Sequence, residues 1–318
     1  MTARCALVTG ATGFVGQHLV RHLQRAGWQV DVIVRSTSDT TALKDQPEPV
    51  SFYEYDNSMD SVLSILAESK PDVVFHLASL VLSEHQPDDI TPLIQSNLLF
   101  GVQLVEAMTQ VGVTSLINTG TFWQHYEGRA YSPVNLYAAT KQAFEDLLQY
   151  YIEAQTLRVI TLKLYDTYGP DDPRPKLINL LRRLASDGQA LAMSPGEQQI
   201  DLTHVDDVSR AFLVAADRFI QGVASGHERY AISSGQPLEL RAVVDKIQRI
   251  LGRKLPIEWG ERPYRTREVM QTWRGSSLPG WEPMISLESW LAGSFATKRV
   301  SVQTPPPRVQ HFRQTTLR

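Results

Sequence analysis

The sequence predicts an α/β fold in which a doubly wound parallel sheet carries a smaller, discontinuous C-terminal lobe. From residue 4 to about residue 164, short apolar runs of strand length alternate with longer stretches of helical spacing, which is typical of βαβ units and a parallel sheet. After Gly169 the chain enters a proline-rich turn segment and then mixed structure, which predicts the second lobe. Of the 318 residues, 42% are hydrophobic and 20% are charged, so a largely disordered chain is excluded.

The expected elements follow these runs in chain order. Strands are expected at residues 6–8, 30–34, 50–55, 72–77, 115–118 and 158–164. Helices are expected at residues 14–26, 60–69, 92–111, 136–154, 177–186 and 205–218. Because the last of these helices is expected to return to the sheet, we assign residues to three parts: a sheet domain at 1–168 and about 200–220, a lobe at 169–199 and 221–295, and a flexible tail at 299–318.

Charge and cysteine content exclude several classes of protein. Lys and Arg number 31 and Asp and Glu number 34, so the net charge of −3 offers no basic excess for nucleic acid. The single cysteine, Cys5, excludes an internal disulfide framework and a cysteine-rich zinc site. No apolar run has membrane-spanning length, and the N-terminus lacks the pattern of a secretory signal, so we expect a cytoplasmic protein without a membrane partner.

A glycine-rich turn follows the first expected strand, where residues 9–16 read TGATGFVG. Gly10 permits a sharp turn, Gly13 lets backbone N–H groups approach a pyrophosphate, and Gly16 allows the next helix to pack closely on the strand. The helix N-terminus adds a favourable field for an anion. This context predicts a Rossmann-type dinucleotide site, with further contacts from Thr12, Phe14 and Val15.

The end of the second strand indicates which dinucleotide is bound. An acidic residue there would bind the ribose 2′-hydroxyl of NAD, but this chain has Arg35 followed by Ser36. A guanidinium can pair with a 2′-phosphate through two hydrogen bonds. We therefore expect NADP(H), with NAD(H) as the alternative; Asp31 lies too early in the strand to serve as the acidic residue.

Tyr137 and Lys141 form a Tyr-x₃-Lys pair in the expected helix at 136–154. Residues four apart lie on one helix face, so the ammonium can lower the pKa of the phenol and also hold the nicotinamide ribose. A phenol activated in this way can donate a proton to a carbonyl oxygen that receives hydride. The pair predicts carbonyl reduction or its reverse.

The two motifs, in this order, resemble those of the extended short-chain dehydrogenase/reductase family, whose members are chiefly nucleotide-sugar epimerases, dehydratases and reductases. The resemblance rests on the Gly-x₂-Gly-x₂-Gly spacing, the Tyr-x₃-Lys pair and a terminal Gly-Trp-x-Pro at residues 280–283, and it covers about residues 4–290. It implies a homodimer formed through a helix bundle of residues 92–111 and 136–154, and a structural role for Asn97.

The resemblance also implies roles for individual residues. It places the catalytic hydroxyl at Thr119, with Thr121 as runner-up and as a substrate contact. It implies cofactor contacts from Asp56, Asn57, Leu77, Ala78, Ser79, Lys141 and Tyr165. It implies that a sugar nucleotide is held by Lys176, Arg265 and Asp166, the last standing where the family usually has Asn.

Within the family, the resemblance is greatest to the bacterial NDP-4-keto-6-deoxyhexose reductases. It implies an NADPH-dependent reductase that delivers hydride to C4 while Tyr137 protonates the oxygen. Family dehydratases have Asp-Glu where this chain has Gly120 and Thr121, so a dehydratase is excluded. Two alternatives are an NAD-dependent NDP-sugar epimerase and a non-enzymatic NADP-binding regulator, which would have no use for Tyr137 and Lys141.

Four histidines lie outside this scheme. His18 and His22 have an i, i+4 spacing that could bind a metal, but no Glu follows the first of them, so we expect two solvated side chains and no metal. His76 is expected to be packed at the end of a buried strand. We expect His204 to be structural, because no nucleophile elbow accompanies it.

Overall fold

The computed structural model describes residues 3–44, 46 and 48–296, so the tail expected at 299–318 lies outside the described residues. Its centre is a parallel sheet of seven strands in the spatial order β11-β6-β5-β4-β1-β2-β3. These strands are β1 (Cys5–Thr9), β2 (Gln29–Val34), β3 (Ser51–Glu54), β4 (Val73–His76), β5 (Ser115–Thr121), β6 (Arg158–Leu164) and β11 (His227–Ile232). The predicted Rossmann-type sheet is confirmed. The strand order reverses between β1 and β4, where open α/β sheets bind their ligands.

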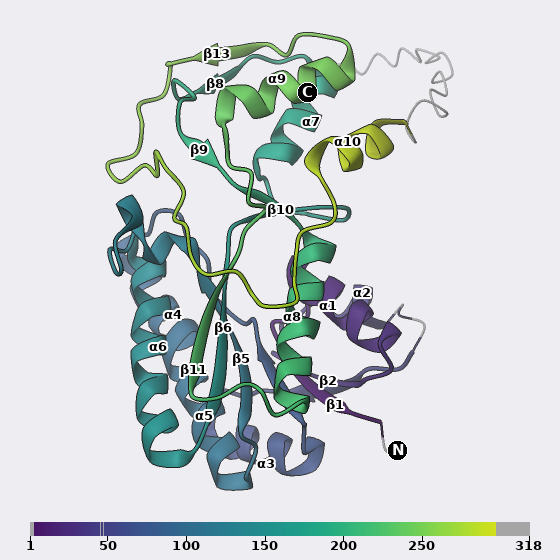
Figure 1. The fold of residues 1–318 in the computed structure, drawn as a ribbon, viewed down its shortest axis with the longest axis vertical. Coiled ribbons are helices and arrows are strands. Elements are labelled where there is room, and N and C mark those ends of the chain that lie inside the picture. The colour runs from purple at the N-terminus through teal and green to yellow at the C-terminus, as the bar shows by residue number, and fades with distance from the viewer. Residues whose placement is uncertain (1–2, 45, 47, 297–318) are drawn as a thin grey trace, which may run out of the picture.

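Helices cover both faces of the sheet, because successive strand residues point to opposite sides. In β1, Ala6 and Val8 pack toward α1 and α8, whereas Leu7 packs toward α3, α5 and α6. Figure 1 shows these two helical layers on either side of the strands. The helices are α1 (Phe14–Arg25), α2 (Thr41–Lys44) and α8 (Val205–Ile220) on one side, and α3 (Met59–Ser69), α4 (Ile90–Ile94), α5 (Phe100–Val111) and α6 (Leu136–Gln155) on the other.

The helix expected at 92–111 is interrupted. A π-helical turn, η2 (Gln95–Leu99), separates α4 from α5 and carries the buried side chain of Asn97. A wider turn of this kind commonly marks a functional site, because it aims one side chain away from the regular helical position.

The lobe lies above the carboxyl ends of the strands in Figure 1 and has its own apolar core, which includes Leu181, Val243 and Leu291. Its helices are α7 (Leu177–Asp187), α9 (Leu240–Leu251) and α10 (Leu287–Ala296). Short strands pair as β7 (Asp166–Tyr168) with β10 (Leu202–His204), β9 (Gln199–Ile200) with β12 (Leu238–Glu239), and β8 (Leu191–Met193) with β13 (Ile257–Trp259). None of the helices in the described residues is long and apolar enough to cross a membrane.

The predicted extent of the lobe is wrong at two places. Strand β11, expected in the lobe, pairs with β6 at the edge of the main sheet. Its first residues are polar, so the apolar pattern did not reveal it. Leu278 and Trp281 also pack in the core beneath α1 and α8, and the Trp281 indole donates a hydrogen bond to Asp207 O at 2.9 Å.

Candidate active site

The carboxyl ends of β1 and β4 are held against each other where the strand order reverses. Gly10 has a φ of +71°, and a Cβ there would lie 2.6 Å from the Ala78 backbone nitrogen. The Thr9 hydroxyl accepts a hydrogen bond from that nitrogen at 3.2 Å and contacts His76 Nδ1 at 2.9 Å. His76 is buried, as predicted. The structure thus brings Gly10 to the chain segment of Leu77 and Ala78.

The first turn of α1 offers backbone donors to an anion. Gly13 is the N-cap of α1, and no side chain caps the helix there. The first N–H groups of the helix are therefore left for another partner. A Cβ at Gly16 would lie 2.2 Å from Gly10 O, so only glycine fits there, whereas a Cβ at Gly13 would come no closer than 3.3 Å to that oxygen. A pyrophosphate fits this helix end, beside the predicted contacts Thr12, Phe14 and Val15.

The ends of β2 and β3 carry the residues predicted to contact the adenosine. Arg35 and Ser36 are exposed, and the Arg35 guanidinium makes no hydrogen bond or ion pair within the described residues. Asp56 accepts a hydrogen bond from Ser58 N at 2.8 Å, and hydrogen bonds with Ser58 lower the pKa of its carboxyl. Asn57 follows in the left-handed region, with a φ of 73°.

Asp31 is buried and faces α3 instead. Its Oδ2 accepts a hydrogen bond from the Ser69 hydroxyl at 2.6 Å. This carboxylate therefore lies away from the strand ends, as its early position in β2 predicts.

Tyr137 and Lys141 lie four residues apart in α6, and both are buried, with exposed fractions of 8% and 2%. Asn135 caps the helix by accepting a hydrogen bond from Ala138 N at 2.9 Å. The Asn135 amide also donates to the carbonyls of residues 82 and 83, at 3.2 and 3.1 Å, in the loop after β4. One residue thus sets both the start of α6 and the loop that faces it.

Asn97 joins the same loop to α6. Its Oδ1 accepts hydrogen bonds from the Ser79 hydroxyl at 3.1 Å and from Leu80 N at 2.8 Å. Its Nδ2 donates to Leu80 O at 3.0 Å and to Thr140 Oγ1 at 2.9 Å. The turn at η2 therefore places Asn97 where it fixes the loop beside Tyr137.

The electrostatics of the Tyr-x₃-Lys pair differ from the prediction. Burial raises the pKa of the Tyr137 phenol, and a hydrogen bond with Ser79, rather than the charge of Lys141, opposes the rise. Burial also lowers the pKa of Lys141 to about 8, against the charge of Glu145. The Lys141 ammonium makes no hydrogen bond or ion pair within the described residues, so it can interact with a ligand.

The two candidate hydroxyls at the end of β5 have different surroundings. Thr119 Oγ1 is buried and has no hydrogen-bond partner within the described residues. Thr121 Oγ1 instead accepts a hydrogen bond from Trp123 N at 3.3 Å and caps a short 3₁₀ helix. Thr119 is therefore the hydroxyl left for a substrate.

Gly120 occupies a tight position. A Cβ there would lie 3.0 Å from the side chains of Gln124, Thr161 and Lys163, which would have to shift by a few tenths of an ångström. The exclusion of a dehydratase therefore rests on the residue types at 120 and 121.

Three predicted substrate residues come together between β7 and the segment of residues 260–286, which we call the strap. Burial raises the pKa of the Asp166 carboxyl, whereas the charges of Lys176, Arg174 and Arg265 lower it. Arg265, on the strap, also forms an exposed ion pair with Glu84 at 3.9 Å. Arg174 is already paired with Asp172 at 2.7 Å, so Lys176 and Arg265 are the two cations here that could contact a diphosphate.

Aromatic contacts fix the strap to the sheet domain. The Tyr165 hydroxyl donates a hydrogen bond to Trp273 O at 2.5 Å, and the Tyr165 ring stacks on Phe122 at 4.7 Å. The Trp273 ring stacks on His125 at 3.9 Å. Tyr165, predicted to contact the cofactor, is thus also an anchor of the strap.

Sequence reasoning missed a buried ionic network behind β5. The carboxylate of Glu145 is fully buried and accepts from Gln124 Nε2 at 2.8 Å and from Arg229 Nε at 2.9 Å. Lys163 Nζ lies 3.4 Å from it. These partners lie on other elements, at sequence separations of 18 to 84 residues from Glu145, so no local spacing in the sequence reveals the network.

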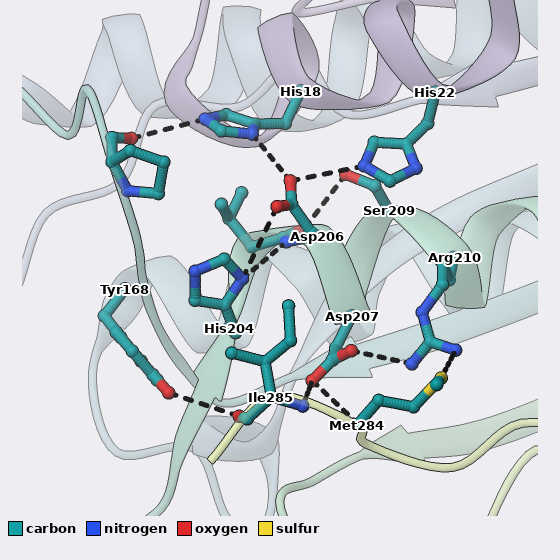
Figure 2. A network of polar contacts seen from close by, with 12 residues as sticks. His18, His22, Tyr168, His204, Asp206, Asp207, Ser209, Arg210, Met284 and Ile285 are labelled. Atoms are coloured by element: carbon teal, nitrogen blue, oxygen red, sulfur yellow. Dashed lines mark hydrogen bonds and ion pairs between the residues drawn. The ribbon is translucent and has the colours of Figure 1, made fainter. Parts of the chain in front are cut away.

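His18 and His22 are not solvated, contrary to the prediction. His18 is 4% exposed, and both imidazoles contact the carboxylate of Asp206 (Figure 2). The polar face of α1 is covered because α8 packs along it. His204, as predicted, is structural: its Nδ1 accepts a hydrogen bond from Asp206 N at 3.2 Å at the start of α8.

Comparison with known proteins agrees with this geometry. The model of the NAD dependent epimerase/dehydratase family matches residues 6–232. The CDP-abequose synthase of Salmonella muenchen is 26% identical over 286 residues, which are 89% of this chain and 94% of that protein. The UDP-glucose 4-epimerase of Mycolicibacterium smegmatis is 27% identical over 306 residues, which are 90% of this chain and 96% of that protein.

A solved structure shares the fold. The UDP-glucose 4-epimerase from Brucella ovis, in complex with NAD, superposes with a TM-score of 0.80 at 22% identity, over 92% of this chain and 98% of that one. The expected resemblance, which pointed to the group that includes CDP-abequose synthase, is confirmed.

Proposed function

The chain belongs to the NAD dependent epimerase/dehydratase family and is an enzyme of that family, and on that premise we propose that it is an NADPH-dependent reductase of a nucleotide-linked 4-keto-6-deoxyhexose. The observation that carries the proposal is the exposed Arg35 guanidinium at the end of β2, which has no partner within the described residues. An arginine there favours a 2′-phosphate, and a reductase draws its reducing power from a dissociable NADPH.

The cofactor would lie across the switch point, with its pyrophosphate on the N–H groups of α1 and its adenosine phosphate on Arg35 and Ser36. Asp56, Asn57 and Tyr165 would complete its surroundings. Bound there, the nicotinamide supplies the hydride for reduction of the substrate carbonyl. The chain's own residues then have to bind, orient and protonate that carbonyl.

Tyr137 donates the proton to the carbonyl oxygen, and Thr119 donates a hydrogen bond to the same atom. The buried, unpartnered Thr119 hydroxyl supports this assignment over Thr121. The ammonium of Lys141, which has no partner within the described residues, would hold the nicotinamide ribose. Because the Thr119 hydroxyl is already in place, little reorganisation is needed as negative charge develops on the carbonyl oxygen.

The substrate's diphosphate is held by Lys176 and Arg265, with Arg174 nearby. Beside these cations, Asp166 contributes a carboxyl group at the position where the family usually has the amide of an Asn. Burial raises its pKa, and the charges of Lys176, Arg174 and Arg265 oppose that rise. The names of the relatives, a CDP-sugar synthase and a UDP-sugar epimerase, support a sugar nucleotide as substrate.

An NAD-dependent NDP-sugar epimerase is the second candidate. It is favoured by the NAD named in the Brucella ovis epimerase structure and by the epimerases among the relatives. An epimerase retains its cofactor and returns the hydride to the same sugar, so it has no need for a 2′-phosphate site. The presence of Arg35 at the end of β2 argues against the epimerase.

We also propose that two copies of the chain pair through the α4–α6 side. Apolar side chains remain exposed along these helices in the single chain: Ile90, Ile94, Leu99, Leu147 and Tyr150, with exposed fractions from 41% to 60%. Such a surface is covered in a helix bundle between subunits.

Incubation of the enzyme with NADPH and a panel of NDP-4-keto-6-deoxyhexoses that differ in the base tests the proposal. Loss of the absorbance of reduced nicotinamide with one class of sugar is the expected result. Interconversion of NDP-hexoses by the protein as purified, without added cofactor and without turnover of any 4-keto sugar, would replace the reductase with the epimerase.

A further inference from the structure

One side of α1 contacts the segment that leads to the substrate lobe. We call residues 169–176, between β7 and α7, the hinge segment. The Arg174 guanidinium lies 4.5 Å from the centre of the Phe14 ring, Arg21 lies 3.7 Å from the Asp171 carboxylate, and His18 Nε2 lies 3.3 Å from Pro170 O. The helix whose first turn would hold the pyrophosphate is thus connected to the segment that ends in Lys176.

A hydrogen-bond acceptor lies beside each ring nitrogen of His18. Its Nδ1 lies 3.0 Å from Asp206 Oδ1 (Figure 2). Its Nε2 lies 3.3 Å from the Pro170 carbonyl. A backbone carbonyl only accepts, and so does an ionised carboxylate. Both contacts are hydrogen bonds only when both nitrogens carry a proton, which is the imidazolium form of His18.

Asp206 is held in the ionised form that this arrangement requires. Hydrogen bonds from His18 and His22 lower the pKa of its carboxyl. His22 Nε2 lies 3.2 Å from the same oxygen, Oδ1. Asp206 also stands in the first turn of α8, where the helix dipole favours a negative charge.

The other charged groups around His18 come from three elements. They are Arg21 and His22 on α1, His204, Asp207 and Arg210 at the start of α8, and Asp171, Asp172 and Arg174 on the hinge segment. Asp207 is paired with Arg210 at 2.6 Å, and Asp172 with Arg174 at 2.7 Å. Burial lowers the pKa of His204, which favours its neutral form. Asp206 is therefore the anion that His18 contacts, and no group of metal ligands is arranged here within the described residues.

We propose that His18 is a positioning residue that, through its contacts with Asp206 and Pro170, couples the cofactor-binding helix α1 to the hinge segment and so to the substrate contact Lys176. Phe14 strengthens the coupling, because its ring packs edge-on against His18 at 5.4 Å and lies in the turn that would face the pyrophosphate. Cofactor binding that orders the start of α1 would then order the hinge segment. The inference rests on the proposed function only in taking a dinucleotide as the ligand of α1.

Hydrogen exchange of the peptide that covers the hinge segment tests this coupling directly. The protein is compared with and without a saturating dinucleotide, NADPH or NADH, whichever binds more tightly, at about pH 6, where Lys141 keeps its charge. Cofactor binding should slow exchange in the hinge segment at least threefold.

Three variants separate the coupling from general packing. His18→Asn keeps a donor near Asp206 but cannot reach Pro170, so the protection should be lost. His22→Gln also keeps one donor to Asp206 and leaves Pro170 untouched, so the protection should remain. His18→Gln can donate to Pro170, so it should rescue the protection that His18→Asn loses.

Equal protection in wild type and His18→Asn, or equal loss in His18→Asn and His22→Gln, would overturn the proposal. If neither dinucleotide binds, the proposed function fails instead. In that case exchange in the protein alone still tests the contact with Pro170. Faster exchange of the hinge segment in His18→Asn than in His22→Gln supports the contact, and equal rates contradict it.

Discussion

Thr119 and Thr121 lie two residues apart on β5, and only the hydroxyl of Thr121 is occupied within the described residues. It caps the following 3₁₀ helix by accepting from Trp123 N, whereas the Thr119 hydroxyl is buried without a partner. A buried hydroxyl without a hydrogen bond is unfavourable unless a ligand completes it. The pair therefore divides into a capping residue and a residue that we propose for the substrate.

Replacement of each threonine by valine should separate these roles. Thr119→Val should lower turnover about 10²-fold, as removal of one preorganised donor does, with little change in stability. Thr121→Val should cost about 1 kcal/mol of folding stability, as loss of a helix cap does, with a smaller effect on turnover. Steady-state kinetics and denaturant unfolding of both variants measure this; the reverse order of the kinetic effects would exchange the two assignments.

Tyr137→Phe should leave cofactor binding intact and reduce turnover by about 10²–10⁴-fold, the usual weight of general acid catalysis. The phenol is buried, so its ring should remain packed after removal of the oxygen. Cofactor titration and turnover of the same preparation provide the comparison. Near-normal turnover would remove Tyr137 from the mechanism.

Cofactor affinity should fall as the pH rises above about 8. Burial lowers the pKa of Lys141 to about 8, so the ammonium loses its charge above that pH, well below the ordinary range of a lysine. The charged form is the stronger hydrogen-bond donor to a ribose hydroxyl. Lys141→Met should bind the cofactor more weakly, turn over more slowly and lack this pH dependence; a matching fall in the variant would place the titrating group elsewhere.

Sedimentation velocity should show a dimer. Leu147→Glu combined with Leu99→Glu should shift it to monomer, because two charges would be buried in the proposed bundle. Val223→Glu, at an equally exposed apolar residue after α8, is the matched control and should remain dimeric. A monomeric wild type, or a dimer that survives both glutamates, would reject this interface.

Much of the fold could be predicted because each strand of the sheet except β11 overlaps a run expected from the sequence. Strand β11 begins with His227, Glu228 and Arg229, and these polar residues pair at the sheet edge, where one side can reach water. The break in the helix at η2 also has no apolar signature, because it depends on the hydrogen bonds of Asn97 to a distant loop.

The residues of the candidate site divide in the same way, into those that local sequence spacing reveals and those that depend on distant contacts. Gly10, Gly16, Tyr137 and Lys141 could be found because local spacing defines their roles. The environment of His18 could not, since Asp206 lies 188 residues away and Pro170 lies 152 residues away in the chain. Contacts of this range arise only when α1 and α8 pack side by side.

The choice between reductase and epimerase depends most on Arg35. A charge-assisted contact through two hydrogen bonds contributes about 1.5–3 kcal/mol, or roughly 10- to 150-fold in affinity. Arg35→Asp should abolish or invert the preference, because a carboxylate repels the 2′-phosphate and accepts a hydrogen bond from the 2′-hydroxyl. Ser36→Ala, which leaves the charge of Arg35 in place, is the control for substitution at this strand end.

The ratio of kcat/KM for NADPH to that for NADH, measured with the wild type and Arg35→Asp on the 4-keto sugar that turns over, is the most direct test. We predict a ratio of about 10 to 150 in the wild type and a ratio at or below about one in the variant. Tightly bound NAD in the purified wild type, together with a ratio near one that Arg35→Asp leaves unchanged, would contradict the reductase and favour the epimerase.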